Sequence, residues 1–297
     1  MTDRFTDLEG LMLGHAVDGH VRTGVTVIRP DSPAAMAVDV RGGGPGTRET
    51  DALRPDCLVD RFHGLVLAGG SVFGLAAADA VAARLSADGY GLDVGPKIVP
   101  VVPAAILFDL KNGGDKEWGV TSPYARLGEA AYDALGRDCP HGRVGAGFGA
   151  TAGRRRGGLG TACLKGPGGF KMAALVAVNS FGDVTDQAGG DPVTLGQVPL
   201  PKLGILGGNT TLAAVATDLD LTKAQCQRLA TMAHDGLARA IRPLHTPYDG
   251  DSVFALSLGS MAPAEPLATT LAVAGTLAAD ALVMAVRRAV ADDSGAE

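Results

Sequence analysis

The spacing of hydrophobic and polar positions predicts more strands than helices along this chain. Seven short segments alternate apolar and polar residues or form β-branched runs, as strands do, namely residues 24–28, 34–40, 64–68, 98–107, 173–179, 211–217 and 252–258. Apolar residues recur at helical spacing in four longer segments, namely residues 73–85, 124–135, 222–241 and 267–290. The last of these opens with Pro266, a residue that suits the first position of a helix.

The order of these elements indicates an α+β fold. Strands come in groups and helices do not alternate with them one for one, which favours a layered arrangement over a doubly wound parallel sheet. Residues 183–208 are rich in turn residues and lack periodicity, so they are the best linker candidate. A chain of 297 residues can bury a sizeable core without metals or disulfides. This length suits one or two globular domains, and we expect a single domain over residues 1–297.

Charge and composition narrow the classes of partner. The chain has 26 Lys and Arg against 32 Asp and Glu, a net charge of −6, and 46% of its residues are hydrophobic, which excludes a disordered chain. The longest basic run is Arg154-Arg155-Arg156, so neither nucleic acid nor an anionic membrane is expected as a partner. A small or neutral substrate fits this composition better.

The cysteines and the N-terminus predict a cytoplasmic protein. The four cysteines, at positions 57, 139, 163 and 226, include no C-x-x-C pair and give no sign of a zinc site or a disulfide framework. The N-terminal segment carries acids where a signal peptide would begin with basic residues. The apolar segment 267–286 contains Asp280 and ends at Arg287-Arg288, which suits a packed helix better than a membrane-spanning one.

Several familiar catalytic motifs are absent from the sequence. It has no Gly-Lys dipeptide and hence no P-loop, no H-E-x-x-H zinc motif and no G-x-S-x-G elbow. Gly145 to Ala150 spells G-x-G-x-x-A, but no helical pattern follows it, as a dinucleotide loop requires. His234 and His245 are more often packed or capping residues than zinc ligands. No metal or organic cofactor is expected.

A glycine-led loop meets a hydrophobic strand at Gly207-Gly208-Asn209-Thr210-Thr211. Glycines leave room beside the peptide bond, while the strand fixes the Thr210 side chain. Such a junction allows an N-to-O acyl shift, in which the Thr210 hydroxyl attacks the Asn209 carbonyl. Hydrolysis of the ester then leaves Thr210 as a new N-terminus whose amine can act as its own base. From the motif alone, an ordinary loop-to-strand turn is the commoner interpretation.

Five strings in order along the chain are similar to one family. They are Leu67-Ala-Gly-Gly-Ser-Val-Phe-Gly74-Leu, Val102-Pro-Ala-Ala-Ile-Leu-Phe108-Asp109, Gly142-Arg-Val-Gly-Ala-Gly147, Gly208-Asn209-Thr210-Thr211 and His245-Thr-Pro-Tyr-Asp249-Gly-Asp251. On these strings most of the chain resembles the self-cleaving β-peptidyl and D-stereospecific aminopeptidases and the nylon-oligomer (6-aminohexanoate oligomer) hydrolases. The resemblance implies an N-terminal-nucleophile-like fold, a four-layer αββα sandwich. The Asn-Thr pair and the Asp-Gly-Asp string look more like the nylon-oligomer branch, because the β-peptidyl aminopeptidases typically use Ser.

Carried over residue by residue, the resemblance implies that Thr210 is the nucleophile and that the Asn179 side chain donates to the oxyanion. Asp249 and Asp251 would orient the amine and hydroxyl of Thr210 from the start of a neighbouring strand. Without the resemblance, Asn179 is as often a turn residue that ends a strand. Asp-Gly-Asp is more often a turn, or occasionally a cation site.

Two positions depart from the family's pattern. The family commonly has Lys where this chain has Arg154, and an arginine is always charged and cannot carry a proton. Either the Thr210 amine carries the proton chemistry and Arg154 supplies only positive charge, or Arg155 or Arg156 alters the site. The nylon-oligomer branch has Tyr where this chain has Phe108, which removes a hydroxyl that could assist the substrate or the oxyanion.

The resemblance implies a self-processing amide hydrolase with a threonine nucleophile, acting on peptides or ω-amino-acid oligoamides without a cofactor. Autocleavage would give an α chain of residues 1–209 and a β chain of residues 210–297, and the resemblance suggests a homo-oligomer, a tetramer of αβ units. Two alternatives stay open, an acyltransferase resembling the ornithine acetyltransferases and an uncleaved, non-catalytic binding protein. Release of free acid without an amine acceptor would exclude the first, and a single band near 30.0 kDa after long incubation would indicate the second.

Overall fold

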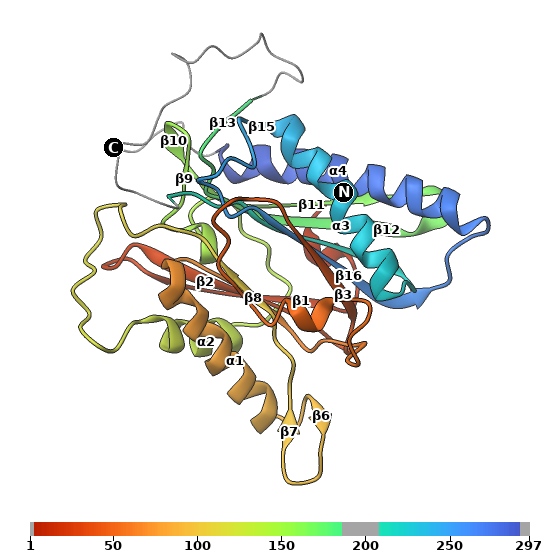
Figure 1. Ribbon diagram of the computed structural model, residues 1–297, viewed down its shortest axis with the longest axis horizontal. Coiled ribbons are helices and arrows are strands. Elements are labelled where there is room, and N and C mark those ends of the chain that lie inside the picture. Colours follow the sequence, from red (N-terminus) through yellow and green to blue (C-terminus); the bar gives the residue numbers. More distant parts are fainter. Residues whose placement is uncertain (1–2, 186–207, 292–297) are drawn as a thin grey trace.

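The computed structural model describes residues 3–185 and 208–291, which form four layers (Figure 1). Two five-stranded sheets stack face to face in the middle of the molecule, with an apolar core between them. A pair of helices covers the outer face of each sheet. The α+β class and the αββα sandwich expected for this chain are therefore confirmed.

The first sheet lies between the core and the helices that are lower in Figure 1. Its strand order is β1 (Leu11–Asp18), β2 (Thr23–Pro30), β5 (Leu65–Ala68), β8 (Ala104–Ile106) and β4 (Thr47–Arg48). Neighbouring strands are antiparallel except β5 and β8, which are parallel. Helices α1 (Ala76–Ala87) and α2 (Tyr124–Asp133) pack on its outer face through an apolar cluster that includes Val27, Val66 and Val81.

The second sheet places the ends of two distant segments side by side. Its strand order is β11 (Gly158–Lys165), β12 (Lys171–Val178), β14 (Leu212–Leu219), β16 (Ser252–Met261) and β3 (Ala35–Val40). Helices α3 (Lys223–Ala240) and α4 (Leu267–Ala289) cover its outer face. Strands β14 and β16 are parallel, and Leu212 pairs with Ser252. The two strands thus begin together, which brings residues 209–211 next to residues 249–251.

Strand β12 shows why the sequence of this sheet is apolar at nearly every position. Leu175 and Ala177 face the core between the sheets, whereas Val176 and Val178 face the helices. Successive side chains of a strand point to opposite faces, so a sheet that is buried on both faces needs apolar residues on both. This requirement accounts for the continuous hydrophobic run that predicts the strand.

Shorter elements connect the layers. Two-residue strands form three small ladders, β6 (Leu92–Asp93) with β7 (Ile98–Val99), β9 (Thr151–Ala152) with β10 (Arg155–Arg156), and β13 (Asp183–Val184) with β15 (Ile241–Arg242). Single turns of 3-10 helix are η1 (Phe5–Asp7), η2 (Asp51–Leu53), η3 (Ser71–Leu75), η4 (Gly145–Gly147) and η5 (Pro167–Gly169). The hairpin of β6 and β7 projects away from the body of the molecule (Figure 1).

Each strand and helix predicted from the sequence has a counterpart, with differences in detail. The segment predicted at 98–107 is two separate strands, β7 and β8, because Pro100 and Pro103 between them cannot donate to a ladder. Helix α4 begins at Leu267, and Pro266 is its N-cap rather than its first residue. Of the linker candidate 183–208, only residues 183–185 and 208 are described, and the remainder lies outside the described residues.

The hydrophobic pattern does not predict strands β1 and β11. Both strands contain a glycine at a position where a helix backbone packs directly against the strand. A Cβ on Gly14 would lie 1.8 Å from the Ala131 carbonyl oxygen of α2, and one on Gly160 would lie 2.0 Å from the Ala285 carbonyl oxygen of α4. Glycine weakens a strand pattern in the sequence. In this fold it lets a helix backbone approach the sheet closely.

Helix α4 is long and apolar enough to count as a candidate membrane span, the one such helix among the described residues. In the fold this helix packs on β11, β12 and α3, and 50% of its most apolar 18-residue stretch is buried inside the protein. This packing agrees with the packed helix that the sequence predicts for the segment.

Candidate active site

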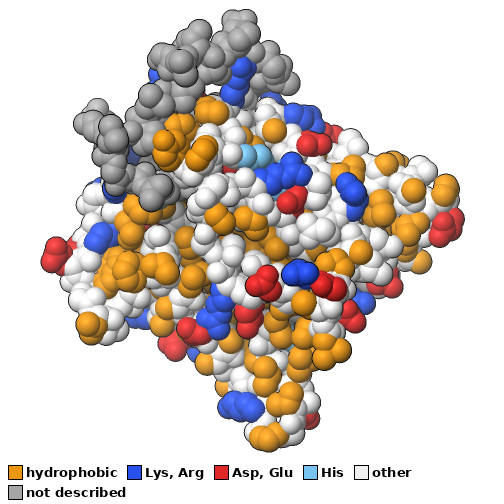
Figure 2. All heavy atoms as spheres, viewed as in Figure 1, with side chains coloured by type: hydrophobic (Ala, Val, Ile, Leu, Met, Phe, Trp, Pro, Cys, Tyr) orange, Lys and Arg blue, Asp and Glu red, His pale blue; other side chains and the backbone are white. Residues whose placement is uncertain are grey.

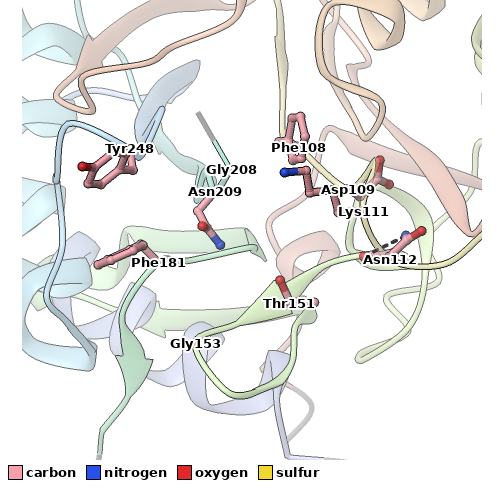
Figure 3. A pocket seen from close by; sticks show the side chains of 11 residues that line it. Phe108, Asp109, Lys111, Asn112, Thr151, Gly153, Phe181, Gly208, Asn209 and Tyr248 are labelled. Atoms are coloured by element: carbon pink, nitrogen blue, oxygen red, sulfur yellow. Dashed lines mark hydrogen bonds between the residues drawn. The ribbon is translucent and has the colours of Figure 1, made fainter. Parts of the chain in front are cut away.

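A pocket of about 390 Å³ opens beside the start of β14. Its lining residues come from five separate segments and are Phe108, Asp109, Lys111, Asn112, Gly149, Thr151, Gly153, Phe181, Gly208, Asn209 and Tyr248. Figure 3 shows Asn209 across the pocket from Phe108 and Lys111, with Phe181 and Tyr248 grouped at one side. Because Gly208 and Asn209 line the pocket, the peptide bond expected to be cleaved lies at its edge.

Thr210 is held in one position at the start of the strand. The residue is only 2% exposed. Its N–H donates to the main-chain oxygen of Asn179 at 2.6 Å, and its hydroxyl donates to the Asn209 carbonyl oxygen at 2.5 Å. The Asn209 side chain is itself fixed by a hydrogen bond to the Ser180 carbonyl oxygen at 3.1 Å. The Thr210 hydroxyl therefore lies against the carbonyl group that an N-to-O acyl shift would attack.

Asn179 links the pocket to Thr210. Its side-chain oxygen accepts from the Thr151 N–H at 2.9 Å, and its NH2 group donates to the Phe108 carbonyl oxygen at 3.0 Å. These partners fix the orientation of the amide, since a main-chain N–H can only donate and a carbonyl can only accept. Among the described residues the NH2 group makes this one donation, so its second hydrogen is available to a further acceptor, such as a developing oxyanion.

Asp249 anchors the aromatic side of the pocket. One carboxylate oxygen accepts from the Phe181 N–H at 3.1 Å, and the other accepts from the N–H and the hydroxyl of Thr246 at 3.0 and 2.6 Å. Burial raises the pKa of the Asp249 carboxyl above its ordinary value, and the nearby charge of Asp251 raises it further. The Phe181 ring lies 5.7 Å from the Tyr248 ring, centroid to centroid. Asp249 thus fixes this wall of the pocket.

Asp251 holds the backbone beside the expected nucleophile. One of its oxygens accepts from the Thr211 N–H at 2.8 Å. The other accepts from the His245 N–H at 3.0 Å and lies 2.8 Å from the Nδ1 atom of the same residue. His245 begins the string that contains Asp251, but its residue type and spacing gave no sign of this role. Its ring packs against His234 at 4.7 Å between centroids, where burial lowers the pKa of His234 to about 4.

The two acids are directed at hydrogen-bond donors and not at a cation. All four carboxylate oxygens of Asp249 and Asp251 accept from N–H or O–H groups or meet the His245 ring. Among the described residues there is no group of three or more His, Cys, Asp or Glu side chains that could hold a metal ion. This arrangement favours a positioning role over the cation site that the sequence left open.

Gly250, between the two acids, lies directly against the nucleophile. A Cβ at this position would lie 2.6 Å from the Thr210 hydroxyl oxygen and 2.8 Å from the Gly44 carbonyl oxygen. We expect Gly250→Ala to displace that hydroxyl and to slow chain cleavage and amide turnover by about tenfold to a hundredfold, because such reactions tolerate little misplacement. Gel densitometry over time and kcat/KM measure the two effects. Gly19→Ala is the matched control, since a Cβ there meets nothing within 4 Å, and equal rates in both variants would contradict the prediction.

Arg154 lies in the turn between β9 and β10 and is not one of the residues that line the pocket. Its side chain is 87% exposed, and its Nη2 atom lies 3.2 Å from a carboxylate oxygen of Asp183. Gly153, with a φ of +56°, makes the tight turn that directs Arg154 toward this partner. The position favours a surface ion pair, and the assignment of Arg154 to the reaction stays a prediction.

The loop 108–112 brings to the pocket polar groups that were not among the candidate site residues. Asp109 is buried and accepts from the Thr23 hydroxyl at 2.6 Å and from the Gly70 N–H at 2.8 Å. Burial raises the pKa of the Asp109 carboxyl, and these two hydrogen bonds oppose the shift. Lys111 and Asn112 follow on the same wall. Their only signal in the sequence is their closeness to one of the five family strings.

Comparisons with known proteins cover nearly the whole chain. The profile of peptidase family S58 matches residues 3–293. An uncharacterized aminopeptidase of Mycobacterium tuberculosis (strain ATCC 25618 / H37Rv) is 40% identical over 319 residues, which cover 95% of this chain and 91% of the relative. A 6-aminohexanoate-oligomer endohydrolase of Kocuria sp. (strain KY2) is 30% identical over 276 residues, which cover 84% of this chain and 74% of the relative.

Solved structures share the fold. A β-aminopeptidase of Burkholderia sp. superposes with a TM-score of 0.75 at 23% identity, covering 97% of this chain and 86% of the other. The L-aminopeptidase D-Ala-esterase/amidase of Ochrobactrum anthropi has a variant of the Ntn hydrolase fold. It superposes with a TM-score of 0.73 at 24% identity, and the match covers 97% of this chain and 85% of the other. These likenesses establish the fold, and the profile and the relatives establish the family. The chain belongs to peptidase family S58 and is a hydrolase of the aminopeptidase and amidase type with the Ntn hydrolase fold.

Proposed function

We propose that this hydrolase processes itself and that its nucleophile is Thr210. The observation that supports the proposal is the 2.5 Å contact between the Thr210 hydroxyl and the Asn209 carbonyl oxygen. The contact is made by a residue that is 2% exposed and is fixed at the start of a central strand. A nucleophile that is already held against a carbonyl group loses little further freedom on reacting, which lowers the barrier.

Self-cleavage would begin when the Thr210 hydroxyl oxygen attacks the carbonyl carbon of Asn209. A C–O bond forms, the C–N bond between the two residues breaks, and the hydroxyl proton passes to the released Thr210 amine. Water then hydrolyses the ester, giving an Asn209 carboxylate and a free hydroxyl. The two products would stay one folded unit, because β14 of the new β chain remains paired with β12 of the α chain.

The processed enzyme would repeat this chemistry on a substrate amide. The Thr210 amine, beside the Asn179 main-chain oxygen, accepts the hydroxyl proton as the hydroxyl attacks the substrate carbonyl carbon. The free hydrogen of the Asn179 NH2 group donates to the oxyanion, an interaction worth about 3 kcal/mol in comparable sites. The product amine leaves with the proton, and water hydrolyses the acyl ester. Asp251 keeps the geometry fixed through the Thr211 N–H.

The proposed substrates are peptides or ω-amino-acid oligoamides. The relatives are named as an aminopeptidase and as a 6-aminohexanoate-oligomer endohydrolase, which both cleave amides. The aromatic side chains of Phe108, Phe181 and Tyr248 line the pocket and suit an aliphatic chain. The pocket volume of about 390 Å³ suits a short aliphatic chain.

Intact mass spectrometry of the purified protein tests the proposal. We expect fragments of about 21 and 9 kDa, in proportion to the lengths of the two chains, with the smaller one beginning at Thr210. The processed protein should release free acid from a short amide without an added amine acceptor, which the acyltransferase alternative would not do. A single 30.0 kDa species after prolonged incubation would contradict self-processing.

A further inference from the structure

Asp249 and Asp251 place two carboxyl groups inside the protein beside the start of β14. Both residues are 0% exposed. Burial raises the pKa of the Asp249 carboxyl, and the charge of Asp251 raises it further. On the face drawn in Figure 2, acidic and basic side chains are interspersed, with no broad surface of one sign that would offset two buried charges. Local hydrogen-bond donors must therefore stabilise the two acids.

His245 supplies two of the three hydrogen bonds that the Asp251 carboxylate accepts among the described residues, and the Thr211 N–H supplies the third. The carboxylate thus joins His245 to the residue that follows the proposed nucleophile. A carboxylate can only accept, so the Nδ1 atom of His245 carries the hydrogen. Of the basic side chains that the structure describes, only the His245 ring lies within ion-pair distance of either acid.

The backbone of His245 has an unusual conformation at this contact. Its φ of +56° lies in the left-handed region, which residues other than glycine rarely adopt. In this conformation the main-chain N–H and the Nδ1 atom both meet the same Asp251 oxygen, at 3.0 and 2.8 Å. Backbone strain of this kind persists only where the surrounding contacts fix it, and it is common at functional sites.

The His245 ring is held in place by a second histidine. His234 of helix α3 is 1% exposed, and its Nε2 atom donates to the Asp39 carbonyl oxygen at 3.0 Å. The two rings pack edge to face at 4.7 Å between centroids. The Nε2 atom of His245 is buried and has no hydrogen-bond partner among the described residues. The polar contact of this ring is therefore the one with Asp251.

We propose that His245 is a positioning residue for the attack by Thr210. His245 holds the Asp251 carboxylate, which in turn holds the Thr211 N–H and with it the backbone that carries the nucleophile. The His245 ring is not among the residues that line the pocket, so it acts through Asp251 and not on the substrate. The proposal rests on the function proposed above, because it requires Thr210 as the nucleophile in self-cleavage and in turnover.

Three substitutions of His245 separate the hydrogen bond from the shape of the ring. Asparagine carries an NH2 group at the place of Nδ1 and tolerates a positive φ, leucine fills similar space without a donor, and glycine relieves the strain without a donor. We expect His245→Leu and His245→Gly to lower the self-cleavage rate and kcat by at least about tenfold, and His245→Asn to stay within about threefold. In the processed proteins KM should stay within about twofold.

A surface histidine supplies the control for these rates. The His20 Nε2 atom lies 2.8 Å from an Asp115 oxygen, as in the buried pair, but the His20 side chain is 78% exposed. His20→Gly should leave the self-cleavage rate and kcat within about twofold. The role of His245 would be overturned by unchanged rates in folded His245→Leu and His245→Gly, by an asparagine variant as slow as these two, or by a raised KM at unchanged kcat.

Thermal melts test the contact without any need for activity. His245→Leu and Asp251→Asn are introduced singly and together into the Thr210→Ala chain, which should stay uncleaved. If His245 holds Asp251, the double variant should lower Tm by clearly less than the sum of the two single shifts, because both changes break the same contact. Additive shifts would overturn the contact.

The Thr210→Ala chain also separates this inference from the proposed function. If that chain is cleaved and hydrolyses amides, Thr210 is not the nucleophile, and both proposals fail. If the unmodified chain is cleaved and active, the Thr210→Ala chain is neither, and the leucine and glycine variants of His245 match the unmodified chain, only the role of His245 fails.

Discussion

A Thr210→Ala chain is expected to remain a single 30.0 kDa species, and its rate of amide hydrolysis is expected to fall at least about ten-thousandfold. The change removes the hydroxyl that contacts the Asn209 carbonyl oxygen and that, in the proposed reaction, would attack the carbonyl carbon through a five-membered ring. Both reactions should disappear together, because one oxygen attacks in each. Intact mass spectrometry measures the first, and release of acid from a short amide measures the second.

The neighbouring threonine supplies the control for this experiment. The Thr211 hydroxyl is buried and has no hydrogen-bond partner among the described residues, while the Thr211 N–H donates to Asp251. Thr211→Val keeps the shape and the N–H, so it should still be cleaved and active. Thr210→Ser, which keeps a hydroxyl, should retain slower cleavage. Cleavage at Asn209 in the Thr210→Ala chain would refute Thr210 as the nucleophile.

An Asp251→Asn chain is expected to cleave itself and to turn over substrate at least about a hundredfold more slowly. Asp251 accepts from the N–H groups of Thr211 and His245 with its two oxygens. An asparagine has one acceptor oxygen, so its NH2 group would face a donor on one side and shift the Thr210-Thr211 backbone. Initial rates of cleavage and kcat/KM measure the effect, and circular dichroism with a thermal melt establishes that the fold is intact.

The other end of β14 carries a suitable control for the acid. Asp220 follows that strand, and its side chain is 56% exposed. Asp220→Asn should leave both rates within about twofold, as surface substitutions usually do. Asp249→Asn should act in the same direction as Asp251→Asn, through the Phe181 and Thr246 segments. Near-normal rates in folded Asp251→Asn protein would contradict the positioning role, and combined with loss of activity on adding EDTA to the unmodified protein they would favour the cation interpretation.

The sequence by itself determined the mixed α+β class of the fold and pointed to residues 209–210 as the candidate junction for cleavage. Hydrophobic runs such as 173–179 and 211–217 predicted strands of a doubly covered sheet, because both faces of that sheet are buried. The helical period predicted α3 and α4 for the same reason, since their apolar faces must pack on a sheet. The family resemblance added Thr210, Asn179, Asp249 and Asp251 as candidates, which the fold then brought into one region.

Only the tertiary structure decided how these residues act on one another. The parallel register of β14 and β16 puts Gly250 against the Thr210 hydroxyl, across about forty residues of sequence that a local pattern does not span. The sequence pattern did not predict strand β11, because its glycines weaken the strand pattern. These glycines leave space for the backbone of helix α4, and this contact between distant segments cannot be inferred from local propensity. Lys111 likewise has an ordinary surface sequence. Its position in the pocket follows from the hydrogen bonds that tie its loop to distant segments, and long-range contacts of this kind form only in the folded chain.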